Sequence, residues 1–340
     1  MVKVKLSYPS WWDQDWGGGI FLWETPNRSG QFSEITYYIN KPIEKCDYWF
    51  VFDDIDQYLF EKTICPRKNV FFITGEVNQR WNYDERFLNQ FSGVLTARAD
   101  LSHPCLFREQ HICAWHIKKD MNFLESYKPT NKAKELSAII SSANKAPGHQ
   151  ERFQFITKLK HDLGHDLDWY GKGVNPIDDK WLGLEQYKYS VAIENSCYHN
   201  YFTEKILDCY LSYTMPIYFG CPNILDFFPE ESMLLIDINN YEKSLEKIKK
   251  AIADNLYDKS FDAILDARKK VLSQLSFFSY LNNWILELEK PLGNKEKVYV
   301  QQQKAYTRKY TVKQSLYKIF AESKLGISGY DKPLRFNNQI

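Results

Sequence analysis

The sequence predicts an α/β fold in which two open, mainly parallel sheets follow one another along the chain. The first observation is a repeated order of aromatic or β-branched run, polar loop and helically spaced run, which is typical of parallel α/β domains. The second is length, because a chain of 340 residues more often forms two domains than one. The third is the polar stretch at residues 126–134, which contains Pro129 and is typical of a linker.

Five strands are predicted before this linker, because each stretch is rich in aromatic and β-branched residues and is bounded by turn-forming ones. They cover residues 2–8, 35–40, 48–52, 69–74 and 94–97. Together they predict an N-terminal domain over residues 1–128.

Beyond the linker the alternation restarts and predicts a second domain over residues 129–295. The predicted strands are 136–141, 167–170, 187–193, 216–219 and 233–237. The predicted helices are 152–163, 203–213 and 241–253, with a further helical pattern at 261–289. The remainder, 296–340, is basic and less patterned, and we expect a tail that can pack on either domain.

The charges are nearly balanced, since 44 basic residues stand against 43 acidic ones. We therefore expect no nucleic acid partner and at most peripheral contact with a membrane. The sequence shows no apolar run long enough to cross a bilayer, and its N-terminus lacks the apolar block of a signal peptide. Seven cysteines without a C-x-x-C pair indicate free thiols in a reducing compartment, so a cytoplasmic location is expected.

In open α/β domains, ligands bind outside the carboxyl ends of the strands, often against the first turn of a helix. The stretch ENSCYHNYFTEKILD, residues 194–208, follows a predicted strand and opens a helix with Thr203, Glu204 and Lys205. Lys205 adds a cation where the helix already concentrates positive charge, so an anion is expected there. Glu204 can accept two hydrogen bonds from a sugar diol. The alternative is that Glu204 complements the helix dipole and Lys205 is solvated.

Arg152 follows another strand and loop, in the stretch SSANKAPGHQER. Its planar guanidinium can grip phosphate with two parallel hydrogen bonds, so Arg152 and Lys205 are predicted to converge on one diphosphate. The alternative is a surface salt bridge between Arg152 and a neighbour such as Glu151.

The stretch VFFITGE places Glu76 just after a buried-type strand and Gly75 in the N-terminal domain. A general base for a hydroxyl nucleophile would lie at such a place, across a gap from a phosphate site. Pairing with Arg80, or capping of the next helix, is the alternative.

Three aspartates, Asp53, Asp54 and Asp56, follow the strand YWFVF. Carboxylates at this spacing can hold Mg²⁺ or Mn²⁺ on a nucleotide diphosphate, and this is a rival enzyme design; a solvated acidic turn is the commoner structure. If Arg152 and Lys205 neutralise the leaving group, a divalent metal is not required. A rival of another class is a non-catalytic glycan-binding protein that stacks sugars on Trp11, Trp12 and Trp16.

With these residues, the sequence resembles the α-1,3/1,4-fucosyltransferases of glycosyltransferase family 10, especially the soluble bacterial members. The match runs from YKYSVAIENS through YFTEKILDCYLSYTMPIYFG, residues 187–220, and is long and specific. Weaker matches lie in ITGE at Glu76 and in the segment SSAN…R that ends at Arg152.

The resemblance implies a GT-B architecture, two Rossmann-like domains that face a central cleft. It implies inverting transfer of L-fucose from GDP-fucose to an acceptor oligosaccharide in α-1,3 or α-1,4 linkage, without a tightly bound cofactor. Glu204 would hold the ribose hydroxyls, Lys205 and Arg152 the phosphates, and Glu76 would deprotonate the acceptor hydroxyl. The donor-site residues that it implies are Arg152, Asn195, Tyr201, Glu204 and Lys205.

Two alternatives keep a transferase function: another nucleotide-activated (deoxy)sugar as donor, or a metal-dependent glycosyltransferase built on the three aspartates. The chain departs from some bacterial members because it lacks leucine-zipper-like heptads near its end, so their dimerisation is not carried over. Soluble relatives imply a bacterial surface polysaccharide as acceptor, such as a lipopolysaccharide O-chain. Acceptor choice is expected to depend on residues 10–19.

Overall fold

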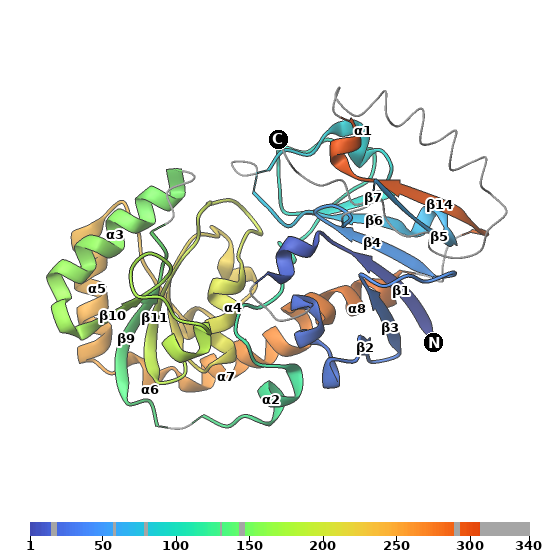
Figure 1. Cartoon of the computed structure of the whole chain (residues 1–340). Coiled ribbons are helices and arrows are strands. Elements are labelled where there is room, and N and C mark those ends of the chain that lie inside the picture. The colour runs from blue at the N-terminus through green and yellow to red at the C-terminus, as the bar shows by residue number, and fades with distance from the viewer. Residues whose placement is uncertain are drawn as a thin grey trace.

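A computed structural model describes residues 1–14, 19–56, 59–77, 81–129, 131–142, 147–288 and 293–306. Figure 1 shows them in two lobes, each built on one sheet, with helix α4 (Glu204–Leu211) at the junction between the lobes. The predicted α/β class, two largely parallel sheets in series as GT-B architecture implies, is confirmed.

The N-terminal lobe has a sheet whose described strands follow the order β2-β3-β1-β4-β6-β7-β8. The bounds are β1 Val2–Ser7, β2 Gln31–Phe32, β3 Ile35–Ile39, β4 Tyr48–Phe52, β6 Val70–Ile73, β7 Gly93–Thr96 and β8 Leu106–Arg108. Neighbouring strands are parallel except β2 and β3. Each of the five strands predicted for this half has a counterpart, namely β1, β3, β4, β6 and β7.

Strand β4 explains why this sheet is buried on both faces. All five of its residues are buried, and alternate side chains enter different clusters. Phe50 and Phe52 pack on one face, whereas Trp49 and Val51 pack on the other. A continuous apolar run is typical of a parallel strand covered on both sides.

The C-terminal lobe has a parallel sheet in the order β10-β9-β11-β12-β13. The strand bounds are β9 Lys134–Ile139, β10 Leu167–Tyr170, β11 Tyr187–Ile193, β12 Met215–Phe219 and β13 Leu234–Leu235. The helices that accompany α4 here are α3 Pro147–Leu163, α5 Tyr241–Ala253, α6 Leu256–Lys259 and α7 Phe261–Lys270. One large apolar cluster joins this sheet to its helices.

After α7 the chain returns to the N-terminal lobe. A short π-helix, Val271–Leu275, leads into α8 (Phe277–Glu287), and Figure 1 shows α8 against the first sheet. Phe277, Phe278 and Trp284 belong to the same apolar cluster as β4. The predicted boundary at residue 295 instead placed this helix with the second domain.

The C-terminal segment also adds a strand to the first lobe. Residues of β14 (Lys295–Gln301) pair antiparallel with β5 (Phe60–Pro66), where no strand was predicted. Val298 and Val300 alternate with exposed neighbours and are buried beside β4. Within the predicted tail, residues 296–301 thus form a strand on the first lobe. Most of that tail lies outside the described residues.

Glu24 joins the two points at which the chain passes between the lobes. Its Oε1 accepts the backbone N–H of Trp115 at 2.6 Å, and its Oε2 accepts that of Phe277 at 2.8 Å. Burial raises the pKa of this fully buried carboxyl to about 8.

All seven cysteines are free thiols in the structure. Among the helices of the described ranges, none combines the length and the apolar character needed to traverse a bilayer.

Candidate functional site

Most of the predicted donor-site residues gather where two strands of the C-terminal sheet end and two helices begin. Helix α3 follows β9 and helix α4 follows β11, and these strands are parallel neighbours. Both helix N-termini therefore lie at one edge of the sheet. Gly148 allows this approach, because a Cβ there would overlap the backbone carbonyl oxygen of Asn195.

Lys205 has an anion within the protein. Its Nζ lies 3.0 Å from Oε2 of Glu194 and 2.8 Å from Oγ1 of Thr203. Glu194, the first residue after β11, is buried and also accepts the backbone N–H of Thr203 at 2.8 Å. The alternative of a solvated Lys205 is therefore wrong, and the anion expected beside Lys205 is supplied within the protein by Glu194.

Glu204 lies among three basic side chains. Its Oε1 is 3.2 Å from Nζ of Lys180, 3.5 Å from Nζ of Lys205 and 3.7 Å from Nδ1 of His116. Burial alone would raise the pKa of Glu204, but Lys205 and Lys180 hold it well below its ordinary value. Glu204 thus stays an ionised acceptor, as a ribose-binding carboxylate needs to be.

Lys180 bridges Glu204 to Asp208, whose Oδ2 lies 3.3 Å from the ammonium. Asp208 Oδ1 also accepts the backbone N–H of His116 at 2.8 Å. Burial raises the pKa of Asp208 to about 7, although Lys180 opposes that rise. The sequence analysis did not select Lys180, Asp208 or His116. One usable signal was Asp208 itself, since a carboxylate on the apolar face of a helix requires a buried partner.

Arg152 projects from the first half of α3 and is 8% exposed. Its side chain makes no hydrogen bond or ion pair with any residue that the structure describes, and its Nε is a buried donor without a partner there. Burial lowers the pKa of its guanidinium, while Glu194 and Glu204 act in the opposite direction. The predicted alternative, a surface salt bridge with Glu151, is therefore wrong.

Asn195 and Tyr201 form the wall beside these charges. The hydroxyl of Tyr201 donates to Oδ1 of Asn195 at 2.8 Å, and Nδ2 of Asn195 lies 3.4 Å from Nε2 of His149 on α3. The Tyr201 ring is buried between Tyr198 and His111, with ring centroids 4.5 Å and 5.0 Å away.

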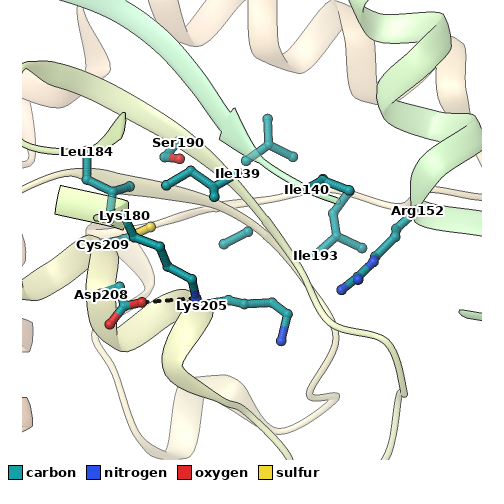
Figure 2. A pocket seen from close by; sticks show the side chains of 12 residues that line it. Ile139, Ile140, Arg152, Lys180, Leu184, Ser190, Ile193, Lys205, Asp208 and Cys209 are labelled. Carbon is teal, nitrogen blue, oxygen red and sulfur yellow. Dashed lines mark hydrogen bonds and ion pairs between the residues drawn. The ribbon is translucent and has the colours of Figure 1, made fainter. Parts of the chain in front are cut away.

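A pocket lies between the two helix starts. Figure 2 shows Arg152 and Lys205 reaching toward the same space from α3 and α4, with Ile140 and Ile193 nearby and Lys180 beside Asp208. Lys205 in the first turn of α4 and Arg152 in the second turn of α3 thus line one pocket. Helix α3 begins at Pro147, five residues earlier than predicted, so Arg152 does not lie in its first turn.

Glu76 comes from the other lobe, three residues after the end of β6, and is 8% exposed. The next residue, Val77, packs with Ala97 against Tyr201 and Tyr198 of the C-terminal lobe. Burial and then Glu194 raise the pKa of Tyr201 most, and Glu76 adds to that rise. Glu76 therefore lies at the lobe junction, next in sequence to a residue that packs on Tyr201. Its alternative partner Arg80 lies outside the described residues.

The three aspartates after β4 bind protein groups. Asp53 accepts the backbone N–H of Gly75, Asp54 accepts that of Gln303, and Asp56 accepts that of Ser10. Within the described ranges, no group of three or more His, Cys, Asp or Glu side chains could hold a metal ion. A metal site built on these aspartates has no geometric support here.

Two of the three tryptophans proposed for glycan binding lie together. The rings of Trp11 and Trp12 stack with centroids 4.6 Å apart, and Trp11 is 38% exposed. Trp16 lies outside the described residues.

Comparison with known proteins identifies one matching family and several relatives. The family model for the C-terminal part of glycosyltransferase family 10 (fucosyltransferase) matches residues 129–262. An α-(1,3)-fucosyltransferase of Helicobacter pylori is 36% identical over 148 residues, which is 42% of this chain and 30% of that protein. The GDP-fucose protein O-fucosyltransferase 3 of Xenopus laevis is 27% identical over 269 residues, 72% of this chain and 56% of that protein. The chain thus spans about a third to about half of the length of these relatives.

Among solved structures, a crystal structure of an α1,3-fucosyltransferase has a TM-score of 0.49 at 19% identity, covering 86% of this chain and 91% of that one. An α1,3-fucosyltransferase with GDP-fucose has a TM-score of 0.46 at 18% identity, covering 80% and 90%. The resemblance predicted from residues 187–220 is confirmed by the family match, since residues 129–262 match the model of the C-terminal part of glycosyltransferase family 10.

Proposed function

We propose that this chain transfers L-fucose from GDP-fucose to a hydroxyl group of an acceptor glycan, with inversion at the anomeric carbon. The observation that carries the proposal is the buried guanidinium of Arg152, which faces the pocket of Lys205 and donates no hydrogen bond to the described residues. A buried donor requires an acceptor, and a diphosphate provides several. The names of the relatives, two fucosyltransferases, supply the donor sugar.

In this proposal, residues from the first two turns of α3 and α4 hold the donor. Arg152 and Lys205 bind the diphosphate, with Lys205 using the hydrogens that Glu194 and Thr203 do not take. Glu204 accepts hydrogen bonds from the ribose hydroxyls, because its pKa keeps it ionised. Asn195 and Tyr201 close the wall of the site toward Glu76.

The chemistry is a single displacement. Glu76 takes the proton of the acceptor hydroxyl, whose oxygen forms a bond to the anomeric carbon of fucose. The bond from that carbon to the diphosphate oxygen breaks, and its electron pair leaves with GDP. Because Arg152 and Lys205 stabilise the negative charge on GDP, the departing group needs no added proton. Attack opposite to the leaving group inverts the anomeric centre, which yields an α-linkage.

Ligand-dependent stability tests the donor site. We expect GDP and GDP-fucose to raise the melting temperature in EDTA, because a ligand that binds only the folded state stabilises it by about 2.7 kcal/mol at a hundred times Kd. Binding of GDP-mannose would show recognition of the guanine nucleotide but not of the sugar. Specificity for fucose is therefore read from transfer assays with GDP-fucose and GDP-mannose. UDP-galactose should give a smaller shift. The proposal fails if no guanine nucleotide shifts the transition, and the donor assignment fails if GDP-mannose is the faster sugar donor.

Two acceptor classes follow from the relatives. The resemblance to bacterial α-1,3/1,4-fucosyltransferases favours an oligosaccharide such as a lipopolysaccharide O-chain, with an α-1,3 or α-1,4 linkage. The match to a protein O-fucosyltransferase over 72% of the chain favours a protein hydroxyl as the second candidate. Transfer of labelled fucose to N-acetyllactosamine or to a folded Ser/Thr-containing domain separates them.

We further propose that the reaction needs neither a divalent metal nor a tightly bound cofactor. Two cationic side chains already serve the diphosphate, while Asp53 and Asp54 accept protein N–H groups. Seven free thiols support a cytoplasmic location. Turnover that requires Mn²⁺ after treatment with EDTA would contradict the first statement.

A further inference from the structure

We propose that Asp53 is a positioning residue that fixes Glu76 relative to the tryptophan pair of the N-terminal lobe. The inference rests on the proposed function, in which Glu76 is the base. Asp53 lies directly after β4, is 2% exposed, and has a backbone φ of 64°. A left-handed conformation is uncommon for a residue with a side chain, and here it turns the carboxylate back under the loop that carries Glu76.

Asp53 binds both the loop that carries Glu76 and the tryptophan pair Trp11 and Trp12. Its Oδ1 accepts the backbone N–H of Gly75 at 2.8 Å and also the hydroxyl of Tyr83. Its Oδ2 accepts Nε1–H of Trp12 at 3.2 Å. One buried carboxylate therefore ties the residue before Glu76 to the indole that stacks on Trp11.

The loop of Glu76 is held from its other side as well. Nη1 of Arg98 donates to the carbonyl oxygen of Glu76 at 3.2 Å and to that of Trp81 at 2.7 Å. The guanidinium also lies 4.9 Å from the ring centroid of Tyr83, so it contacts the same tyrosine that Asp53 binds. The peptide group before Gly75 and the peptide group after Glu76 are thus both held, which favours a pre-organised base.

Gly75 makes this geometry possible. A Cβ at Gly75 would overlap the Phe52 ring and would come within 2.7 Å of Oδ2 of Asp53. The strand ends of β4 and β6 therefore approach each other so closely that the carboxylate reaches the backbone of the Glu76 loop. With Trp12 in edge contact with Phe52, an acceptor sugar stacked on the tryptophan pair would have a fixed position relative to Glu76.

The test compares Asp53→Asn with Asp47→Asn, its matched control. Asp47 precedes β4 as Asp53 follows it, and it also accepts a backbone N–H, that of Lys3 at 2.8 Å. We expect Asp53→Asn to lower kcat by about tenfold to a hundredfold, because small displacements of a reacting group have effects of that size. The dissociation constant for GDP should stay unchanged, and Asp47→Asn should leave kcat unchanged.

A second measurement separates positioning from a general loss of structure. If Asp53 acts through Glu76, Asp53→Asn should add no further loss of turnover in a Glu76→Gln background. Independent, additive losses, a kcat like that of Asp47→Asn, or weaker GDP binding in Asp53→Asn would each overturn the inference. If Glu76→Gln alone keeps full turnover, the proposed base is wrong instead.

Two milder variants keep the test decisive if Asp53→Asn does not fold. Trp12→Phe and Tyr83→Phe retain aromatic rings, and each removes one hydrogen-bond donor to Asp53. Each should lower kcat in the same direction by a smaller factor, without changing GDP affinity. Full kcat in both variants would overturn the inference.

Discussion

Nζ of Lys205 lies 3.0 Å from Oε2 of Glu194, a carboxylate that is itself fully buried. A lysine in the first turn of a helix predicts an anion, and the strand before the helix supplies it. Because Glu194 also accepts the N–H and O–H of Thr203, the pair fixes the direction of the ammonium. A diphosphate would therefore share Lys205 with Glu194 and would bind a cation that is already oriented.

Glu194→Gln should destabilise the free protein by about 2 kcal/mol, since it removes a charged partner of Lys205 and weakens two further hydrogen bonds. GDP should recover part of this loss, because phosphate oxygens can replace the lost carboxylate charge. The measurement is the melting temperature with and without GDP. A GDP-induced shift that is smaller than in the unaltered protein would contradict this account of Lys205.

Arg152→Met should weaken GDP binding without lowering the stability of the free protein. It removes a buried cation that has no described partner, so the free protein should keep or gain stability. GDP affinity should fall by about tenfold to a hundredfold, the equivalent of one charged hydrogen-bonded contact of about 1.5–3 kcal/mol.

The control for Arg152→Met is Lys158→Met on the same helix, where Lys158 is 52% exposed and pairs with Glu242. It should change neither stability nor affinity appreciably. Calorimetric titration with GDP and thermal unfolding measure both quantities. A marked loss of stability in Arg152→Met would show that the guanidinium has a structural partner.

Most strands of both sheets could be predicted, because the hydrophobic periodicity and residue composition of a strand are properties of the local sequence. Strand β11 and helix α5 have the predicted bounds, residues 187–193 and 241–253. Strand β14 was missed because its alternation of Val298 and Val300 is short and lies among lysines. Its partner β5 is far away in sequence, so only tertiary pairing reveals the strand.

The candidate site likewise contains residues that the local sequence predicts and residues that only tertiary packing brings together. Arg152 and Lys205 could be predicted because each lies near a helix start after a strand. Lys180 and His116 could not, because they meet Glu204 only when a 3-10 helix and the segment that crosses between the lobes pack against α4. Asp53 was considered only as part of a rival metal site or of a solvated acidic turn; the structure shows it buried, with its carboxylate accepting the backbone N–H of Gly75.

Glu76→Gln should lower turnover by about a hundredfold to ten-thousandfold, the range of general base catalysis. GDP binding should be preserved, because Arg152 and Lys205 lie in the other lobe. Steady-state transfer and GDP titration of the same preparation provide the measurement. Glu85→Gln serves as the control, because Glu85 is exposed in the short helix α1 (Glu85–Leu88). Reduced GDP affinity with retained turnover would exclude Glu76 as the base.

The pH dependence of stability should contain a contribution from Asp208. Burial raises its folded pKa to about 7, from an ordinary value of 3.8, against the opposing effect of Lys180. Between these values the folded state holds a proton that the unfolded state has released, so the free energy of unfolding falls as pH rises.

Asp208→Asn should make that slope shallower, since an amide cannot titrate and its oxygen can still accept the N–H of His116. Some slope should remain, because burial also raises the pKa of Glu24 to about 8 and that of Asp54 to about 7. Urea unfolding from about pH 5 to about pH 7 measures the difference. An unchanged slope would mean that Asp208 is ionised throughout this window, as it would be if Lys180 outweighed burial.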